Sequence, residues 1–154
     1  MDINEIKIRK MVEADIDFII RANKEVREAS NQTNAIFELR RRLMDDILSD
    51  EPKAYIIVTE YNNQLIGMAL YSTVYFADNG ETMWLSNIFV EADYQNKGIA
   101  KEMIKHLKQI CKNENYCAIW AAVEDENEKS KTFFDSINGK WLNGFKMVGV
   151  EENK

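Results

Sequence analysis

The amino-acid sequence predicts an α/β fold with a mixed sheet, and two observations carry that prediction. Residues 54–90 contain three runs rich in β-branched, aromatic and apolar residues, and short turn signals separate them. Such a pattern is typical of an antiparallel meander. The spacing of apolar residues changes within 84–113. A continuous apolar run and a short turn come first, and apolar residues then recur at steps of three and four. A strand that leads into a helix in this way favours parallel neighbours in the same sheet.

Length and composition narrow the class of protein. The 154 residues predict a single domain over 1–154 with a substantial core. The chain has no apolar run of membrane-spanning length, no signal-peptide pattern and two cysteines, Cys111 and Cys117, which together predict a cytoplasmic protein without a membrane segment. The single histidine, His106, is interpreted as a solvated helix residue, and so few ligands argue against a metal site. The net charge of −6 argues against nucleic acid and is compatible with a small cationic substrate.

The N-terminal third is expected to form a strand and two helices. Residues 5–11 alternate in hydrophobicity, and Asp15 then precedes an amphipathic helix as a candidate cap. A polar loop is expected at 29–34. The apolar positions of a second helix follow at Ile36, Leu39, Leu43, Met44 and Ile47. The run at 40–42 is three arginines, which form either the solvated side of this helix or a site for a phosphate or a partner.

The remaining elements follow from the same signals. Strands are expected at 54–61, 65–76 and 82–90, a helix at 98–113 and a strand at 117–123. Because a helix separates the last two strands, they should be parallel neighbours. A helix ending near Ile137 and one or two strands within 140–150 complete the order β-α-α-β-β-β-α-β-α-β.

The turn at 95–100 is the first candidate site. A strand, a turn with a glycine and then a helix leave several amide groups at the helix start without intrahelical partners. Those donors and the positive end of the helix dipole favour a diphosphate, and Gly98 would allow close approach to its backbone. An ordinary strand-to-helix connection is the alternative. Neither a P-loop nor a dinucleotide-binding glycine motif is present.

Two motifs carry a resemblance to a known family. The turn reads Gln95-Asn96-Lys97-Gly98-Ile99-Ala100, as in the signature Arg/Gln-x-x-Gly-x-Gly/Ala. The second motif, Asn-x-x-Ala/Ser-x-x-Phe-Tyr, is matched from Asn127 through Ser130 to Phe134. With the order of elements, the chain resembles the GNAT superfamily of N-acetyltransferases over nearly its whole length.

The resemblance implies acetyl-CoA as the cofactor. The amides from Asn96 to Lys101 would bind its pyrophosphate, and its pantetheine arm would pair with the backbone of Ile88, Phe89 and Val90 like an added strand. Parallel strands that splay apart would expose those backbone groups. Asn127 and Ser130 would contact the arm or the diphosphate. Core packing for residues 88–90 and a helix cap at Asn127 are the alternatives.

The sequence departs from the family at two places. The likeness is greatest to the diamine and polyamine acetyltransferase branch, which has an acidic pair where this chain has Ser86 and Asn87. With Tyr71, these two residues are candidates for contacts with the acceptor. Phe134 stands where the family often has a tyrosine that protonates the leaving thiolate, which a phenylalanine cannot do.

Together these observations predict transfer of an acetyl group from acetyl-CoA to a primary amine of a small cationic metabolite, by direct attack in a ternary complex. The catalytic residue is not identified by the sequence. Glu124 and Asp125 are candidates for a base acting through water, and a solvated loop is the alternative. A catalytically silent acetyl-CoA-binding regulatory module is the other candidate function, and a homodimer is compatible with either.

Overall fold

The computed structural model describes residues 1–26 and 33–150. The chain packs as two compact units, Met1–Ala122 and Val123–Lys154. One domain over the whole chain therefore stays a prediction.

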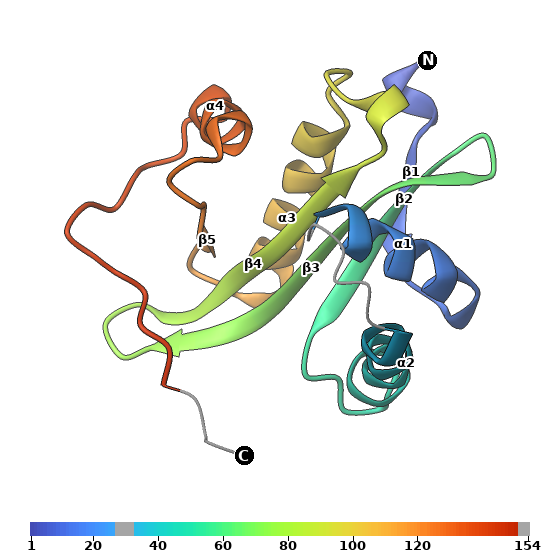
Figure 1. Ribbon diagram of the computed structural model, residues 1–154. Helices are drawn as coiled ribbons and strands as arrows, with labels where there is room; N and C mark the ends of the chain where they lie inside the picture. Colours follow the sequence, from blue (N-terminus) through green and yellow to red (C-terminus); the bar gives the residue numbers. More distant parts are fainter. Residues whose placement is uncertain (27–32, 151–154) are drawn as a thin grey trace. The chain divides into compact units, whose positions relative to one another are not determined.

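The first unit is built on a five-stranded sheet in the order β1-β2-β3-β4-β5 (Figure 1). Neighbouring strands are antiparallel except for β4 and β5, which are parallel as predicted. The strands are β1 Lys7–Lys10, β2 Tyr55–Tyr61, β3 Gln64–Phe76, β4 Gly80–Val90 and β5 Ile119–Ala121.

Residues with positive φ close the two hairpins of the meander. Asn62 and Asn63 have φ of 48° and 60°, so the turn that joins β2 to β3 is of the type whose twist matches that of its strands. Gly80 has φ of 83° at the start of β4, a value at which a side chain would be strained. The turns predicted at 62–63 and 78–80 are therefore confirmed.

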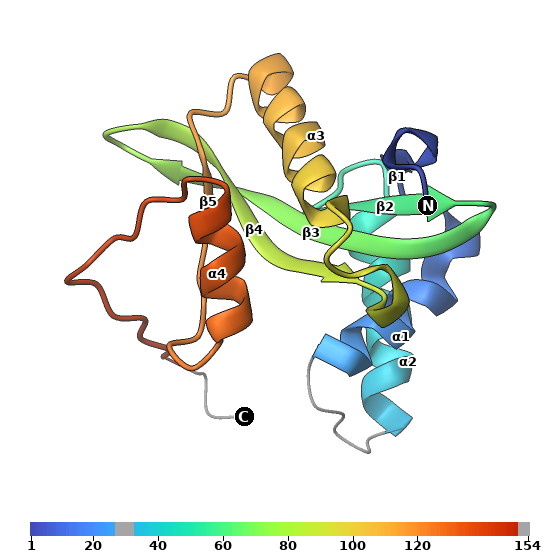
Figure 2. The ribbon, with the colours of Figure 1, turned by 90° about the horizontal axis from the view of Figure 1, so that it is seen from above.

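Helices cover both faces of this sheet (Figure 2). The helices α1 and α2 lie on one face, and α3 lies on the other. Their bounds are α1 Ile16–Val26, α2 Thr33–Arg42, a π-helical turn at Leu43–Ile47 and α3 Ile99–Glu114, with short 3-10 turns at Ile3–Glu5, Glu13–Asp15 and Ala92–Tyr94. A loop was predicted at 29–34. Residues 29–32 lie outside the described residues, and residues 33 and 34 already belong to α2.

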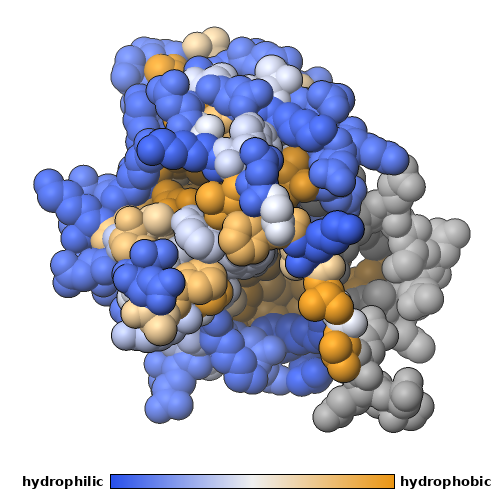
Figure 3. All heavy atoms as spheres, turned by 90° about the vertical axis from the view of Figure 1, so that its left-hand side faces the viewer, coloured by the Kyte–Doolittle hydropathy of each residue, from blue (hydrophilic) through white to orange (hydrophobic). Residues whose placement is uncertain are grey.

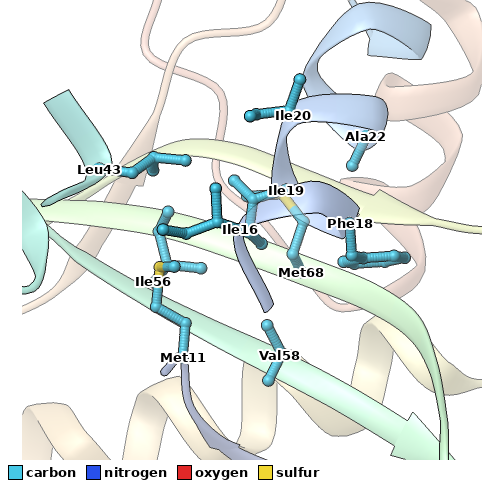
Figure 4. Packing of buried hydrophobic residues seen from close by; sticks show 10 residues of the cluster. All are labelled: Met11, Ile16, Phe18, Ile19, Ile20, Ala22, Leu43, Ile56, Val58 and Met68. Atoms are coloured by element: carbon cyan, nitrogen blue, oxygen red, sulfur yellow. The ribbon is translucent and has the colours of Figure 1, made fainter. Parts of the chain in front are cut away.

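The core on the first face joins α1 to the sheet. Its buried side chains are labelled in Figure 4: Met11, Ile16, Phe18, Ile19, Ile20, Ala22, Leu43, Ile56, Val58 and Met68. Asp15 was expected to cap α1, but it does not. Its carboxylate accepts from the preceding Val12 amide at 2.8 Å and pairs with Arg9 at 2.7 Å.

The α3 helix buries the apolar face that the sequence predicts. Ile99, Met103, Ile104, Leu107 and Cys111 are all buried. On the same side of the sheet, Cys111 Sγ lies 4.0 Å from Met83 Sδ. His106, expected to be solvated, is half-buried, and burial lowers the pKa of its imidazole.

In its described part, residues 123–150, the second unit contains one helix, α4 Glu128–Ser136. The strands predicted within 140–150 are absent, because none of these residues joins a ladder. Alternating apolar residues form a strand only where a neighbouring strand accepts their hydrogen bonds. Their side chains stay exposed, from 46% at Trp141 to 95% at Val150. Figure 3 shows hydrophobic atoms at the surface of the face that it draws.

Candidate functional site

A β-bulge interrupts β4 at Ser86. Tyr71 of β3 pairs with Leu85 of β4. The next residue of the pairing, Leu70, lies opposite Asn87, and Ser86 is left over as the extra residue. A bulge re-aims the side chains that follow it. Asn87 therefore shares the sheet face of Leu70, which packs on the α1 core.

The bulge marks the place where β4 and β5 part. Their ladder ends where Leu85 pairs with Ala121, although β4 continues to Val90. Beyond Leu85, no described strand lies along the edge of β4 that faced β5. The splayed parallel strands expected from the resemblance are therefore present.

The ladder also fixes which backbone groups face this open edge. The amide of Glu91 donates to the Ile66 carbonyl of β3 at 2.8 Å. Because hydrogen-bonded pairs alternate along an antiparallel ladder, Phe89 also turns its backbone groups toward β3. Ile88 and Val90 therefore direct their amides and carbonyls to the open edge. The Phe89 ring packs at 6.3 Å from that of Phe18.

Gln95 connects the strand to the turn that follows. Its side-chain amide donates to the Val90 carbonyl at 2.9 Å. Among the described residues, this leaves the amides of Ile88 and Val90 and the carbonyl of Ile88 for a ligand at the open edge. An extended ligand with alternating amides could pair with such groups as an added strand does.

The turn at 95–98 exposes the start of α3. Asn96 and Gly98 have φ of 59° and 85°, and Gly98 is the N-cap residue. The amide of Glu102 makes the first intrahelical bond, to the Gly98 carbonyl at 3.1 Å. Since Gly98 has no side chain that could accept, the amides of Ile99, Ala100 and Lys101 are donors without an intrahelical partner. These donors and the helix dipole suit an anion.

Two exposed lysines add positive charge to this turn. Lys97 donates to the Asp93 carbonyl at 2.9 Å and lies 5.6 Å from the centre of the Tyr94 ring. Lys101 lies in the first turn of α3. Both cations are placed to reinforce attraction of a phosphate.

The candidate acceptor residues differ in accessibility. Ser86 is exposed at the bulge, and Asn87 is half-buried. Tyr71 is only 3% exposed and its ring stacks on Tyr55 at 5.2 Å. Burial raises the pKa of Tyr71 to about 12. A side chain so enclosed cannot contact a substrate in this conformation.

The candidate residues of the second unit gather on α4. The Asn127 side chain accepts from the Ser130 amide at 3.0 Å and so caps this helix. The half-buried Phe134 ring lies 5.2 Å from that of Phe133 and 6.4 Å from that of Trp141. Glu124 and Asp125 are exposed in the segment before the helix.

A cleft beside the end of β4 was not predicted from the sequence. It has a volume of about 400 Å³, and an ion pair of 2.6 Å between Arg21 and Glu91 lies on its wall. Its lining residues are Phe18, Arg21, Gln64, Leu65, Ile66, Glu91, Asp93 and Tyr94. Arg21 and Glu91 are seventy positions apart, so no local pattern could have joined them.

The described residues provide neither a metal cluster nor a membrane helix. No group of three or more metal-ligating side chains comes together among them. No helix in the described part is both long and apolar enough to cross a bilayer. The three arginines of α2 are exposed, where Arg40 pairs with Asp17 and Arg41 with Glu38, as expected for a solvated helix side.

Comparison with known proteins now decides the family. The acetyltransferase (GNAT) family matches residues 21–139. The chain belongs to the GNAT family. It is thus an acetyl-CoA-dependent N-acetyltransferase domain.

Several relatives have a related sequence or fold. A human spermidine/spermine N(1)-acetyltransferase-like protein 1 is 31% identical over 68% of this GNAT chain, which spans only 16% of that relative. A pig thialysine N-epsilon-acetyltransferase is 22% identical, with 89% of this chain and 85% of the relative covered. The crystal structure of a possible acetyltransferase from Clostridium difficile 630 has the same fold, with a TM-score of 0.78, 24% identity and coverage of 97% and 99%.

The residues of this GNAT chain fit acetyl-CoA in two independent ways. The open edge at Ile88 and Val90 offers backbone groups of the kind that pantetheine amides require. The turn at 95–98 offers amides and lysines to a diphosphate. The single strand β4 and the turn after it place both features in one stretch of chain.

Proposed function

We propose that this chain transfers the acetyl group of acetyl-CoA to a primary amine of a small cationic metabolite, by direct attack within a ternary complex. The open edge of β4 beside the uncapped start of α3 is the observation that carries this proposal. Acetyl-CoA, when bound, supplies the thioester that the amine attacks. The printed names of relatives, a spermidine/spermine-type and a thialysine acetyltransferase, support an amine as the acceptor.

The backbone at the open edge would position and polarise the reacting carbonyl. An amide of Ile88 or Val90 that points away from β3 can donate to an oxygen on which negative charge develops. The bulge at Ser86 is what turns these groups outward. Holding both reactants in one geometry supplies much of the rate enhancement in such a site.

Ser86 and Asn87 would bind the acceptor amine without contributing charge. The exposed Ser86 hydroxyl can accept from an amine, and the Asn87 amide lies on the α1 side of the sheet. An alkyl ammonium has a pKa of about 10.4 in water and must lose a proton before attack. Glu124 or Asp125, acting through water, is our candidate for this base. Phe134 cannot protonate the departing thiolate, but the thiol of CoA should resemble that of a free cysteine, with a pKa of about 8.5, so its thiolate is an adequate leaving group.

A silent acetyl-CoA-binding module is the second candidate. Phe134, Ser86 and Asn87 favour it, because each lacks the acid found in related enzymes. Both candidates predict binding of acetyl-CoA, and only the first predicts turnover.

Release of CoA thiol from acetyl-CoA with a panel of amines distinguishes the two. The panel should contain diamines, polyamines, aminoglycosides, amino acids and peptide N-termini. We expect turnover with at least one small cationic amine and none without an acceptor. Calorimetric binding of acetyl-CoA without turnover on any amine would favour the silent module, and acetylation of peptide N-termini alone would contradict the acceptor class.

A further inference from the structure

Two tryptophans share one face of the sheet. Trp84 of β4 and Trp120 of β5 are partners in the parallel ladder, so their side chains project from the same side. Trp84 also pairs with Ser72 of β3, which lies on the face of Leu70 and Phe76 because strand residues alternate. The Phe76 ring lies 4.8 Å from that of Trp120, which places Trp120 on this face as well.

This face is the one that carries α1 and not the one that carries α3. Leu70 packs on the α1 core, whereas Met83 contacts Cys111 of α3 on the opposite side. Trp84, Trp120 and Phe76 are all half-buried, so each residue keeps part of its surface exposed.

The tryptophans lie directly before the opening between β4 and β5. The pair of Leu85 with Ala121 is the last of this ladder and directly follows the pair of Trp84 with Trp120. Asn87 follows on the same face, beyond the bulge. Trp84 is about 10 Å from Asn87 at the usual rise of a strand, and the bulge shortens that path. A small extended molecule can therefore touch an indole and reach the open edge at once.

The chemistry of the surface formed by Trp84 and Trp120 suits a positive charge. Ser86 and Asn87 carry no carboxylate, so an ammonium at the bulge finds no ion-pair partner there. The face of an indole attracts cations through its quadrupole, more strongly than the rings of tyrosine or phenylalanine. The nitrogen that attacks must be neutral, so a cation held against these indoles is a second group of the same acceptor.

We propose that Trp84 and Trp120 form a specificity wall that binds a second, positively charged group of the acceptor by cation–π contact. The acceptor class is then a primary amine joined by a short apolar chain to an ammonium or trimethylammonium group. This inference rests on the proposed acetyl transfer and assigns its charge selectivity to indoles instead of carboxylates.

Three acceptors of equal chain length test the wall. They are a diamine, the amino alcohol in which a hydroxyl replaces the second amine, and the aminoalkyl-trimethylammonium ion. The trimethylammonium group donates no hydrogen bonds, so it separates cation–π binding from a hydrogen-bonded carboxylate site. We expect both cationic acceptors to have KM values about 2- to 30-fold below that of the amino alcohol.

Substitutions locate the effect. W84L and W120L should each abolish the preference for the cationic acceptors, and the loss should appear as a raised KM for those acceptors, because lost uniform binding appears in KM. W84F and W120F keep a weaker ring and should give intermediate values, which also guards against misfolding of the leucine variants. Y75L is the matched control. Tyr75 is 73% exposed and lies on the opposite face of the same hairpin, so its loss should leave the preference unchanged.

The experiment distinguishes failure of the proposed wall from failure of the proposed acetyl transfer. An unchanged preference in both leucine variants, or a trimethylammonium acceptor as poor as the amino alcohol, would overturn the wall and leave acetyl transfer standing. If no amine is turned over although acetyl-CoA binds, the transferase proposal fails. The wall is then judged by calorimetric binding of the same three compounds to the CoA complex, where absence of the charge preference overturns it.

Discussion

Thr59 is a polar residue with no exposed surface on β2. Its hydroxyl finds no hydrogen-bond partner among the described residues. Burying a hydroxyl without a partner costs about 1–3 kcal/mol. We therefore expect T59V, which keeps the branched shape, to raise the free energy of unfolding by about 1 kcal/mol. Urea denaturation measures this change.

Thr82 provides the matched control for that prediction. It is equally buried, but its hydroxyl lies 2.9 Å from Cys117 Sγ and donates to the Gly80 carbonyl at 3.5 Å. T82V should therefore be neutral or destabilising. A T59V variant that loses as much stability as T82V would contradict the assigned cost.

Asp15 should make stability depend on pH in the acid range. Burial acts to raise the pKa of its carboxyl, but hydrogen bonds from Arg9 and the Val12 amide outweigh burial and lower the pKa. A lowered folded-state pKa gives stability that is present above the unfolded value of about 3.9 and is lost as pH falls through the folded value. D15N should cost about 1–2 kcal/mol at neutral pH, and the difference from the natural protein should shrink below about pH 4.

Urea denaturation of both proteins across that range checks the Asp15 prediction. D17N is the control, because Asp17 also pairs with an arginine, Arg40, but its side chain is 87% exposed. An exposed pair contributes about 0–1 kcal/mol. A pH-independent gap between D15N and the natural protein would show that the carboxylate is not the stabilising form.

Phe134 leads to a prediction about the pH dependence of turnover. A tyrosine acid would make kcat fall as pH rises through about 10. We expect no such fall between about pH 8 and pH 10, since the ring carries no proton to donate. F134Y should keep the fold, because its ring packs equally against Phe133 and Trp141 and gains only a hydroxyl.

The measurement is kcat against pH for both proteins, with circular dichroism to exclude unfolding. A descending alkaline limb in the natural protein would mean that another acid acts. Tyr94, half-buried near the turn, and the exposed Tyr75 are then the residues to replace, whereas the burial of Tyr71 sets its pKa at about 12.

At the scale of elements, the turn between β4 and α3 should bind the diphosphate. Gly98 has φ of 85°, and an added Cβ would meet no atom within 4 Å. A valine there is therefore strained by its backbone, and its side chain would occupy the open space in which we expect the phosphate to bind. We expect G98V to weaken acetyl-CoA binding at least tenfold by calorimetry, which is about 1.4 kcal/mol.

Gly80 separates strain from binding in this experiment. Its φ of 83° and its open surroundings match those of Gly98, but it lies at the β3–β4 hairpin. G80V should lose similar stability and retain affinity for acetyl-CoA. A folded G98V with unchanged affinity would reject the turn as the diphosphate site.

At the scale of the whole molecule, a net charge of −6 should assist cationic acceptors. The Debye length falls from about 10 Å at 0.1 M salt to about 3 Å at 1 M salt. We expect kcat/KM for a diamine to fall over this range and that for a neutral-tailed amino alcohol to change less. W84L should keep the same salt slope, because it changes no charge. A diamine with no salt dependence would show that the surface charge has no part in recruitment.

Local chemistry allowed much of the fold to be predicted from the sequence. The Asn62-Asn63 turn, the Gly98 turn and the apolar face of α3 depend on residues adjacent in the chain, where backbone preference and periodicity apply directly. The turn at 95–98 could therefore be predicted as a candidate site for a diphosphate. Ser86 and Asn87, our candidate acceptor contacts, carry no charge, which could also be read from the sequence.

Contacts between distant residues were decided only by the tertiary structure. The bulge at Ser86 exists only relative to β3, and it determines that Ile88 and Val90 face the open edge. The residues at 140–150 have the pattern of a strand but no neighbouring strand to pair with. The pairing of Trp84 with Trp120 depends on the register of two strands separated by α3. Hydrogen-bond partners in a sheet come from elsewhere in the chain, so a strand's own residues cannot specify its edge.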